Sequence, residues 1–186
     1  MQEDIKKALE TLKSGGVILY PTDTVWGLGC DATNEAAVSK IYSIKKREDS
    51  KSMLVLLNNA ARISSYIREV PEIAWELIDV AVEPITLIYP GAKNLAKNLI
   101  AEDGSIGIRI TDDDFCCELI QRFGKPVVSS SANISGEKTP SIFSEISMEI
   151  KDSVDYIVQW RQGDFTKKSP SSIIKLGEGG LFKILR

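Results

Sequence analysis

The sequence contains no histidine, so its chemistry cannot depend on the side chain that most often acts as a general base near neutral pH. It has three cysteines, Cys30, Cys116 and Cys117, and this odd number with an adjacent pair fits neither a disulfide framework nor a zinc site. No apolar run reaches the roughly 18 residues of a membrane span, and the charged, amphipathic N-terminus does not resemble a signal peptide. We therefore expect a protein of the reducing cytoplasm.

An excess of positive charge is also lacking, because 23 Lys and Arg residues stand against 26 Asp and Glu residues, for a net charge of −3. This balance argues against a surface devoted to nucleic acid, although it leaves room for a local basic patch. The 186 residues are 43% hydrophobic, which is enough for a substantial core. We expect a single domain over residues 1–186.

The spacing of apolar residues predicts both helices and strands, without strict alternation between them. The fold class expected is therefore α/β (α+β), with helices packed on an open mixed sheet. The helices are expected near 5–12, 38–44, 71–80, 111–123 and 142–150, and the strands at 17–20, 53–57, 85–89, 105–110, 126–130, 155–159, 171–176 and 181–185. The stretch at 21–33 is expected to be a long connection, and Thr111 is expected to be a helix N-cap.

Small polar side chains gather where predicted strands end. Ser129, Ser130, Ser131 and Asn133 lie at the end of the strand at 126–130 and just after it, and they can bind a polar ligand without adding charge. The connection after the first strand offers the hydroxyls of Thr22 and Thr24 and two glycines that let a backbone approach a ligand closely. The alternative is that both stretches are ordinary turns.

Cations lie at two informative places. Lys45, Lys46, Arg47 and Lys51 end a predicted helix, where they would either complement the helix dipole or hold phosphates. Arg109 stands inside an apolar strand, where a guanidinium is costly unless it is paired. It would pair with the acids at 112–114 or with an anionic ligand. Since the sequence has no Walker A motif and no Ser-His-Asp set, phosphoryl or nucleotidyl transfer, which needs mainly positioning and charge neutralisation, fits best.

The motifs PTDTVWGLGCDA, Lys45-x-Arg47 with Lys51, SIGIRI and PVVSSSANISG, in this order, resemble the YrdC-like family, which includes the threonylcarbamoyl-AMP synthases. The resemblance extends over nearly the whole chain and implies a twisted open α/β sheet with a large concave surface. It implies a nucleotidyltransferase that joins L-threonine, bicarbonate and ATP with Mg²⁺, releasing pyrophosphate. A partner transferase would then modify adenosine 37 of tRNA.

The resemblance also implies roles for individual residues. The residues expected to bind ATP are Lys45, Arg47, Lys51, Ser105, Ser131, Asn133, Thr139 and Arg186, of which Lys45, Arg47 and Lys51 would be catalytic through the triphosphate. The residues expected to bind threonine are Thr24, Arg109, Ser129 and Ser172. It identifies no protein ligand for the metal ion, for which Asp23 is a candidate. Trp26 stands where the family usually has tyrosine, and Thr111-Asp112 follows the Arg109 strand where proline is frequent.

Two other functions remain open from the sequence. One is a double-stranded RNA or tRNA-binding module of the same fold without synthase activity, in which the cations would contact successive phosphates. The other is a nucleotide hydrolase, or an adenylyl transferase that acts on another amino acid.

Overall fold

A computed structural model describes residues 1–46 and 53–186. Its strands form one open mixed sheet in the order β7-β1-β2-β6-β3-β5-β4-β8-β9, as the sequence predicted for the fold class. The strands are β1 (Ile18–Tyr20), β2 (Gly27–Gly29), β3 (Leu54–Leu57), β4 (Ile85–Tyr89), β5 (Ile106–Ile110), β6 (Val127–Ser131), β7 (Tyr156–Ile157), β8 (Ser172–Leu176) and β9 (Phe182–Ile184). The α-helices are α1 (Gln2–Lys13), α2 (Glu35–Ile44), α3 (Glu72–Val80), α4 (Asp114–Phe123) and α5 (Met148–Asp152). Short 3-10 turns lie at Ala60–Ser65, Lys97–Leu99, Phe143–Glu145 and Glu178–Gly180.

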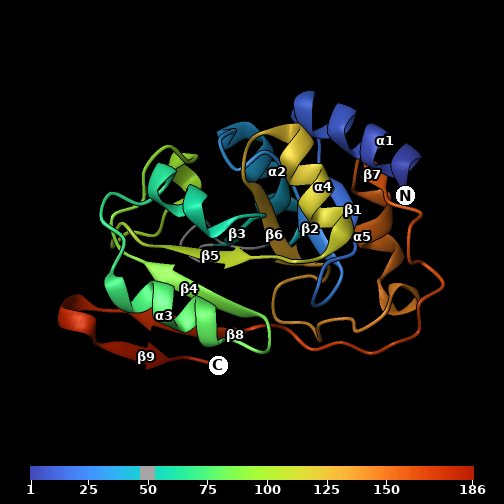
Figure 1. The fold of residues 1–186 in the computed structure, drawn as a ribbon. Coiled ribbons are helices and arrows are strands. Elements are labelled where there is room, and N and C mark those ends of the chain that lie inside the picture. Colours follow the sequence, from blue (N-terminus) through green and yellow to red (C-terminus); the bar gives the residue numbers. More distant parts are fainter. Residues whose placement is uncertain (47–52) are drawn as a thin grey trace.

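The helices divide between two parts of the sheet (Figure 1). Helices α1, α2 and α4 gather near β1, β2 and β6, whereas α3 lies beside β4 and β8. The N-terminus lies near β7 and the C-terminus near β9, the two ends of the strand order. Within the described ranges no helix is long and apolar enough to cross a membrane.

The central strands alternate their side chains between the two faces, as a pleated strand must. In β5, Ile106 and Ile108 are buried on one face, while Gly107 and Arg109 line a cavity on the other. Ile108 shares its face with Ile78 of α3, since both line a separate hollow there. The cavity that contains Arg109 is therefore on the sheet face opposite α3.

The stretch at 21–33 was wrongly predicted to be a plain connection. Its residues Gly27–Gly29 form β2, which pairs with β1 and β6. A β-carbon at Gly29 would lie 2.6 Å from Cε1 of Tyr20, so the ring of Tyr20 fits only because the facing residue is glycine. A strand of three residues with a single apolar side chain, Leu28, is too short to show the alternation by which strands are predicted.

Two further predictions need correction. The N-cap of α4 is Asp113, whose carboxylate accepts a hydrogen bond from the backbone N–H of Cys116 (3.1 Å), and Thr111 instead accepts from the N–H of Asp113. The helix expected at 142–150 is a 3-10 turn followed by the short helix α5, which begins with Ser147 as its N-cap. In both places several capping residues stand close together, so that composition alone did not fix the helix start.

Candidate active site

The candidate site is a cavity of about 240 Å³ on the sheet face opposite α3. Strands β2, β6, β3, β5, β4 and the start of β8 supply its walls, so it spans segments from residue 24 to residue 186. Six of the predicted contact residues line it: Thr24, Arg109, Ser129, Ser131, Thr139 and Arg186. The fold therefore brings together predicted residues of both the threonine and the nucleotide groups.

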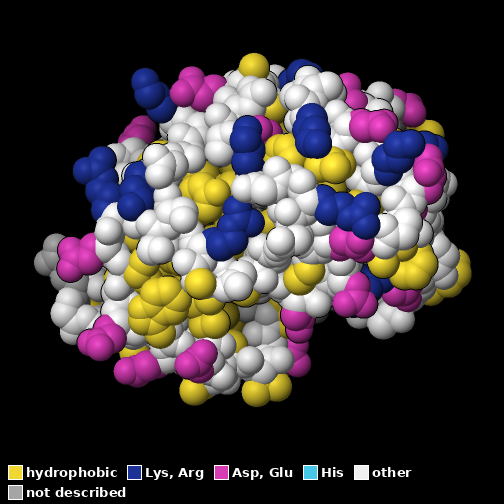
Figure 2. Space-filling model, turned by 45° about the horizontal axis from the view of Figure 1, so that its top comes forward, with side chains coloured by type: hydrophobic (Ala, Val, Ile, Leu, Met, Phe, Trp, Pro, Cys, Tyr) yellow, Lys and Arg dark blue, Asp and Glu magenta, His cyan; other side chains and the backbone are white. Residues whose placement is uncertain are grey.

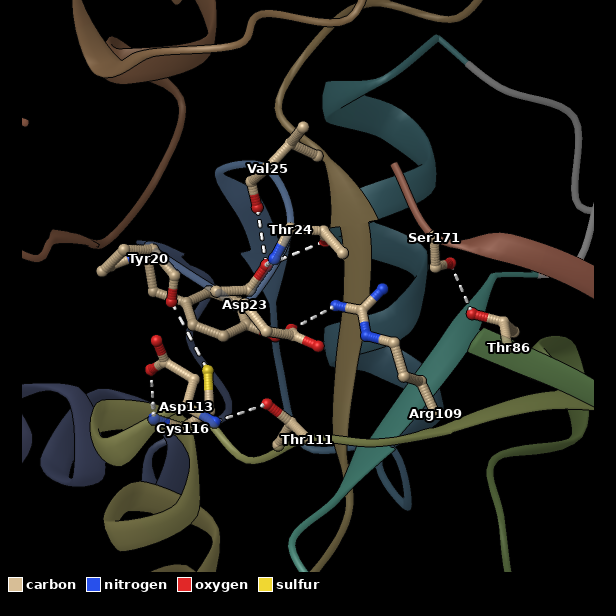
Figure 3. Close-up of polar contacts among 12 residues, drawn as sticks. Tyr20, Asp23, Thr24, Val25, Thr86, Arg109, Thr111, Asp113, Cys116 and Ser171 are labelled. Carbon is tan, nitrogen blue, oxygen red and sulfur yellow. Dashed lines mark hydrogen bonds and ion pairs between the residues drawn. The ribbon is translucent and has the colours of Figure 1, made fainter. Parts of the chain in front are cut away.

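Arg109 is the buried cation of this cavity. Its side chain is 3% exposed, and one of its guanidinium nitrogens donates to Oδ1 of Asp23 at 3.0 Å (Figure 3). The pairing acid is therefore in the 21–33 segment and is not one of the acids at 112–114. Nε of Arg109 is buried and has no hydrogen-bond partner among the described residues. Since an unpaired buried donor is costly, this nitrogen marks a place where an anion would be stabilised.

Asp23 holds the guanidinium from one side. Burial raises the pKa of its carboxyl, and the charge of Arg109 partly offsets this effect. The carboxylate is thus maintained mainly by its partner, and the two charges depend on each other for their burial.

Thr24 lines the cavity, and the hydrogen bonds around its hydroxyl show which way this hydroxyl donates. The hydroxyl of Thr22 donates to the carbonyl of Val25 at 2.8 Å, so its single proton is used. The contact of 3.1 Å between the hydroxyls of Thr22 and Thr24 must then be a donation from Thr24. The lone pairs of Thr24 remain for a donor in the cavity, such as an ammonium or a hydroxyl group.

Ser129 and Ser131 end β6, next to Gly27 of β2. A β-carbon at Gly27 would lie 3.3 Å from Oγ of Ser129, so the glycine keeps the space beside this hydroxyl open. Ser130 also lines the cavity and is 8% exposed. The wall thus offers hydroxyl groups without a charge, as the sequence suggested.

At the start of β8 the structure differs from the predicted contact. Ser171, which is 3% exposed, lines the cavity, whereas Ser172 is exposed and does not line it. Adjacent residues of an extended chain point to opposite sides, and the sequence did not define which serine faced inward. The guanidinium of Arg186 lies beside this position and donates to the carbonyl of Ser171 from Nε (3.1 Å) and from a terminal nitrogen (3.0 Å).

Lys45 follows α2 as its C-cap and is 1% exposed. Its ammonium donates to the carbonyl oxygens of Ser131 and Asn133, the second at 2.7 Å. The backbone N–H of Ser135 donates in turn to the carbonyl of Lys45 at 2.8 Å. Lys45 therefore ties the loop after β6 to the end of α2, beside the cavity. Arg47 and Lys51, the other predicted phosphate ligands, lie outside the described residues.

Two predicted nucleotide contacts lie away from the cavity lining. Ser105 donates its hydroxyl to Asp103 at 2.5 Å within the turn before β5. Asn133 donates from Nδ2 to the carbonyls of Ile134 and Glu137, both at 2.9 Å, and its buried Oδ1 has no partner in the described part of the chain. Ser105 is thus engaged in its own turn, while Asn133 keeps one acceptor unused.

The described residues provide no evident metal site. Among them no group of three or more carboxylates or thiols is arranged to hold an ion. Asp23 lines the separate hollow beside α3, and its Oδ1 is already paired with Arg109.

Comparison with known proteins identifies the family. The family model Sua5/YciO/YrdC, described as telomere recombination, matches residues 10–186. The chain belongs to this family. Among YrdC-type relatives, the threonylcarbamoyl-AMP synthase of Pseudoalteromonas translucida is 34% identical over 185 residues, which cover 98% of each chain. A putative threonylcarbamoyl-AMP synthase of Methanocaldococcus jannaschii is 34% identical over 188 residues, covering 98% of this chain and 87% of the relative.

Solved structures of the Sua5/YciO/YrdC family agree with the fold. E. coli YciO superposes with a TM-score of 0.86 at 26% identity, over 100% of this chain and 89% of YciO. P. abyssi Sua5 complexed with L-threonine gives the same TM-score of 0.86 at 24% identity, over 98% of this chain. The chain spans about half of that Sua5 chain, 53% of its length. The likeness to Sua5 is therefore one of fold.

Three residues of the site were not among the predicted contacts: Asp23, Thr86 and Ser171. Asp23 stands in the PTDT motif, and the need of buried Arg109 for a counter-charge was the signal that could have identified it. Thr86 is a hydroxyl in the middle of the apolar strand β4, and an isolated polar residue there needs a partner in the same way. For the serine at the start of β8, the only available signal was the alternation of side chains between the two faces of the strand, which could have favoured Ser171 over Ser172 as the cavity residue.

Proposed function

We propose that the chain is a threonylcarbamoyl-AMP synthase, which converts L-threonine, bicarbonate and ATP into threonylcarbamoyl-AMP and pyrophosphate. The observation that carries the proposal is the buried guanidinium of Arg109, with an unpartnered Nε, in a cavity walled by hydroxyl groups. Two relatives of nearly the same length that are named as this synthase or as its putative form support it.

Arg109 would bind the carboxylate of threonine, since a guanidinium presents a planar set of donors to a carboxylate. Thr24 would accept from the amine or the hydroxyl group of the amino acid, because its own proton is directed to Thr22. Ser129 would complete this group. The amino acid would thus be held by strands β5 and β6 and by the segment before β2.

The reaction would proceed in two bond-forming steps. The threonine amine adds to CO₂ derived from bicarbonate and loses a proton, giving a carbamate. A carbamate oxygen then attacks the α-phosphorus of ATP, the bond to the β-phosphate oxygen breaks, and pyrophosphate leaves. The protein would hold two anions together and exclude water from a labile mixed anhydride.

The nucleotide would enter as its Mg²⁺ complex, with the ion bound to the phosphates as part of the substrate. Ser131, next to Asn133, and Thr139 would bind the nucleotide, and Arg186 would reach it from its place beside Ser171. The segment with Arg47 and Lys51 would neutralise the triphosphate. The product would pass to a transferase that modifies adenosine 37 of tRNA. No histidine is needed for these steps.

An RNA-binding module is the less favoured alternative. Figure 2 shows Lys and Arg side chains interspersed with Asp and Glu, and with apolar and uncharged groups, over the face that it presents. Binding of several phosphates in series requires a continuous basic surface and gives affinity that falls steeply with salt.

The experiment measures pyrophosphate release from ATP with bicarbonate and a panel of amino acids. We expect release that depends on threonine, and little with valine or alanine, because these amino acids lack the hydroxyl group. Release without an amino acid, or equal release with every amino acid, would assign the chain to nucleotide hydrolysis or to another adenylyl transfer.

A further inference from the structure

Two buried hydroxyl groups meet at the floor of the cavity. Oγ1 of Thr86 on β4 and Oγ of Ser171, just before β8, are 2.8 Å apart (Figure 3). Both residues line the cavity, and they are only 2% and 3% exposed. Buried hydroxyl groups are normally hydrogen-bonded, and here each satisfies the other.

The direction of the Thr86 hydroxyl is fixed by packing. A β-carbon at Gly107 of β5 would lie 3.3 Å from Cγ2 of Thr86, so the methyl group of Thr86 sits directly against the β5 backbone. A β-branched side chain is stiff at χ1, and the position of its methyl group therefore fixes that of its hydroxyl. The hydroxyl points to the opposite neighbour of β4, which is β8.

The backbone of Ser171 is fixed as well, but its side chain is held by Thr86. The carbonyl of Ser171 accepts two hydrogen bonds from Arg186, at 3.1 and 3.0 Å. The next backbone N–H, of Ser172, donates to the carbonyl of Pro84 at 3.2 Å. The only hydrogen bond found for the Ser171 hydroxyl in the described part of the chain is the one to Thr86.

We propose that Thr86 is a positioning residue, which orients the hydroxyl of Ser171 so that this hydroxyl binds the amino-acid substrate. The inference rests on the proposed function and deepens it, because it assigns a residue that sets the direction of the hydroxyl at the start of β8, where the resemblance had placed an amino-acid contact one residue further on, at Ser172. A hydroxyl has one proton and two lone pairs, and the bond to Thr86 takes one of these. The hydrogen-bonding positions of the Ser171 hydroxyl that Thr86 does not occupy then point into the cavity before the substrate binds. Less conformational entropy is therefore lost when the amino acid binds.

The first test is Thr86→Val, which keeps the branched shape and the methyl group and removes the hydroxyl. We expect the KM for threonine to rise about three- to tenfold, the value of one neutral hydrogen bond, with kcat and the KM for ATP nearly unchanged. Thr86→Ser should restore the KM for threonine. The matched control is Thr111→Val, the same change at a threonine that is also 2% exposed but lies outside this cavity, and it should leave the KM for threonine unchanged.

The second test separates positioning from direct contact. Ser171→Ala should raise the KM for threonine at least as much as Thr86→Val, and adding Thr86→Val to Ser171→Ala should cause no further rise. If the rises in the KM for threonine caused by the two single variants multiplied in the double variant, Thr86 would not act through Ser171, and the inference would be overturned. An equal rise in the KM for threonine in the Thr111→Val control would show that the loss of any buried hydroxyl has this effect. That outcome would also overturn the inference.

Calorimetry of threonine binding to the wild-type chain distinguishes the inference from the proposed function. If the wild type binds threonine and releases pyrophosphate but Thr86→Val has an unchanged KM, this inference alone fails. If the wild type neither binds threonine nor turns it over, both fail.

Discussion

The two walls of the cavity are built in different ways. One wall, here called the strand-built wall, is formed by β5, β4 and the start of β8. It carries Arg109, Thr86 and Ser171, whose directions follow from strand pairing and from close contacts at glycine. The other wall, here called the loop-built wall, is formed by the irregular chain that follows β6. Lys45 holds it by donating to the carbonyls of Ser131 and Asn133. The comparison teaches that the first wall is rigid because of strand pairing, whereas the second depends on a side chain that donates to backbone carbonyls.

The largest effect is expected at the strand-built wall, from Arg109→Met. This change removes the proposed carboxylate contact and leaves the charge of Asp23 buried without a partner. We expect kcat/KM for threonine to fall by about a hundredfold or more, and the free energy of unfolding to fall by about 3–5 kcal/mol. Pyrophosphate release and urea denaturation measure the two quantities.

The double variant Arg109→Met with Asp23→Asn is the control for this result. It removes both charges, so it should recover most of the lost stability while activity stays low. Full activity in either variant would show that Arg109 does not bind the substrate, and the strand-built wall would then lack its proposed carboxylate contact.

The second effect concerns the loop-built wall. Lys45→Met removes the ammonium that ties the loop after β6 to α2, so we expect the free energy of unfolding to fall by about 1–3 kcal/mol. The KM for ATP should rise more than the KM for threonine, because the loop borders the nucleotide side. Steady-state kinetics with each substrate varied in turn, together with urea denaturation, test this.

Lys46→Met is the matched control, since the Lys46 side chain is 64% exposed and pairs with Glu149 at the surface. It should change neither KM appreciably. A Lys45→Met chain of unchanged stability whose kcat alone collapses would show that Lys45 acts on the reacting phosphates, as the sequence had suggested, and would break the comparison.

The third effect is the pH dependence of the strand-built wall. Burial raises the pKa of Asp23, so this carboxyl takes up a proton at a higher pH than an ordinary aspartate. Protonation abolishes the ion pair with Arg109, and kcat/KM for threonine should therefore fall on the acid side with a midpoint above 3.8, the ordinary value. The contribution of Asp23 to stability has the opposite sign, decreasing as the pH rises from 3.8 towards the folded-state pKa.

A pH profile of kcat/KM in the wild type and in Asp23→Asn tests this. The variant should have low activity at every pH and should lack the Asp23 part of the acid decline. An acid decline of the same midpoint in both chains would assign it to another group.

The sequence predicted the strand-built wall better than the loop-built one, for a physical reason. Strand β5 has period-two alternation, and this pattern placed Arg109 on one face among apolar neighbours. Because burying the charge of Arg109 is costly, a partner for its guanidinium was expected, but the sequence did not identify that partner as Asp23. Strand β2 is Gly-Leu-Gly, three residues with one apolar side chain, which is too short to show a period-two pattern, and it was not predicted even though Gly27 lines the cavity.

The bonds of the loop-built wall cannot be derived from local patterns. Lys45 and the carbonyl of Asn133 are 88 positions apart, and their bond is set by packing between distant elements. At the end of a helix a lysine was equally consistent with a phosphate ligand and with a capping residue. The same limit applies to Ser171 and Ser172, where one residue of register decides which hydroxyl enters the cavity.

The smallest effect concerns the aromatic contact that supports the loop-built wall. Trp26 lines the cavity, and the centre of its ring lies 4.8 Å from the centre of the Phe143 ring, in the 3-10 turn at Phe143–Glu145. Nζ of Lys151, on α5, lies 4.5 Å from the centre of the same Phe143 ring. Phe143→Leu keeps an apolar side chain but removes both ring contacts, so we expect the free energy of unfolding to fall by about 1 kcal/mol, with Trp26 fluorescence altered. Phe165→Leu, at a side chain that is 71% exposed, is the control and should change neither quantity. If Phe143→Leu left stability and fluorescence unchanged while raising the KM for ATP, the aromatic contact would not support the loop-built wall, and the contrast between the two walls would rest on the two hydrogen bonds donated by Lys45.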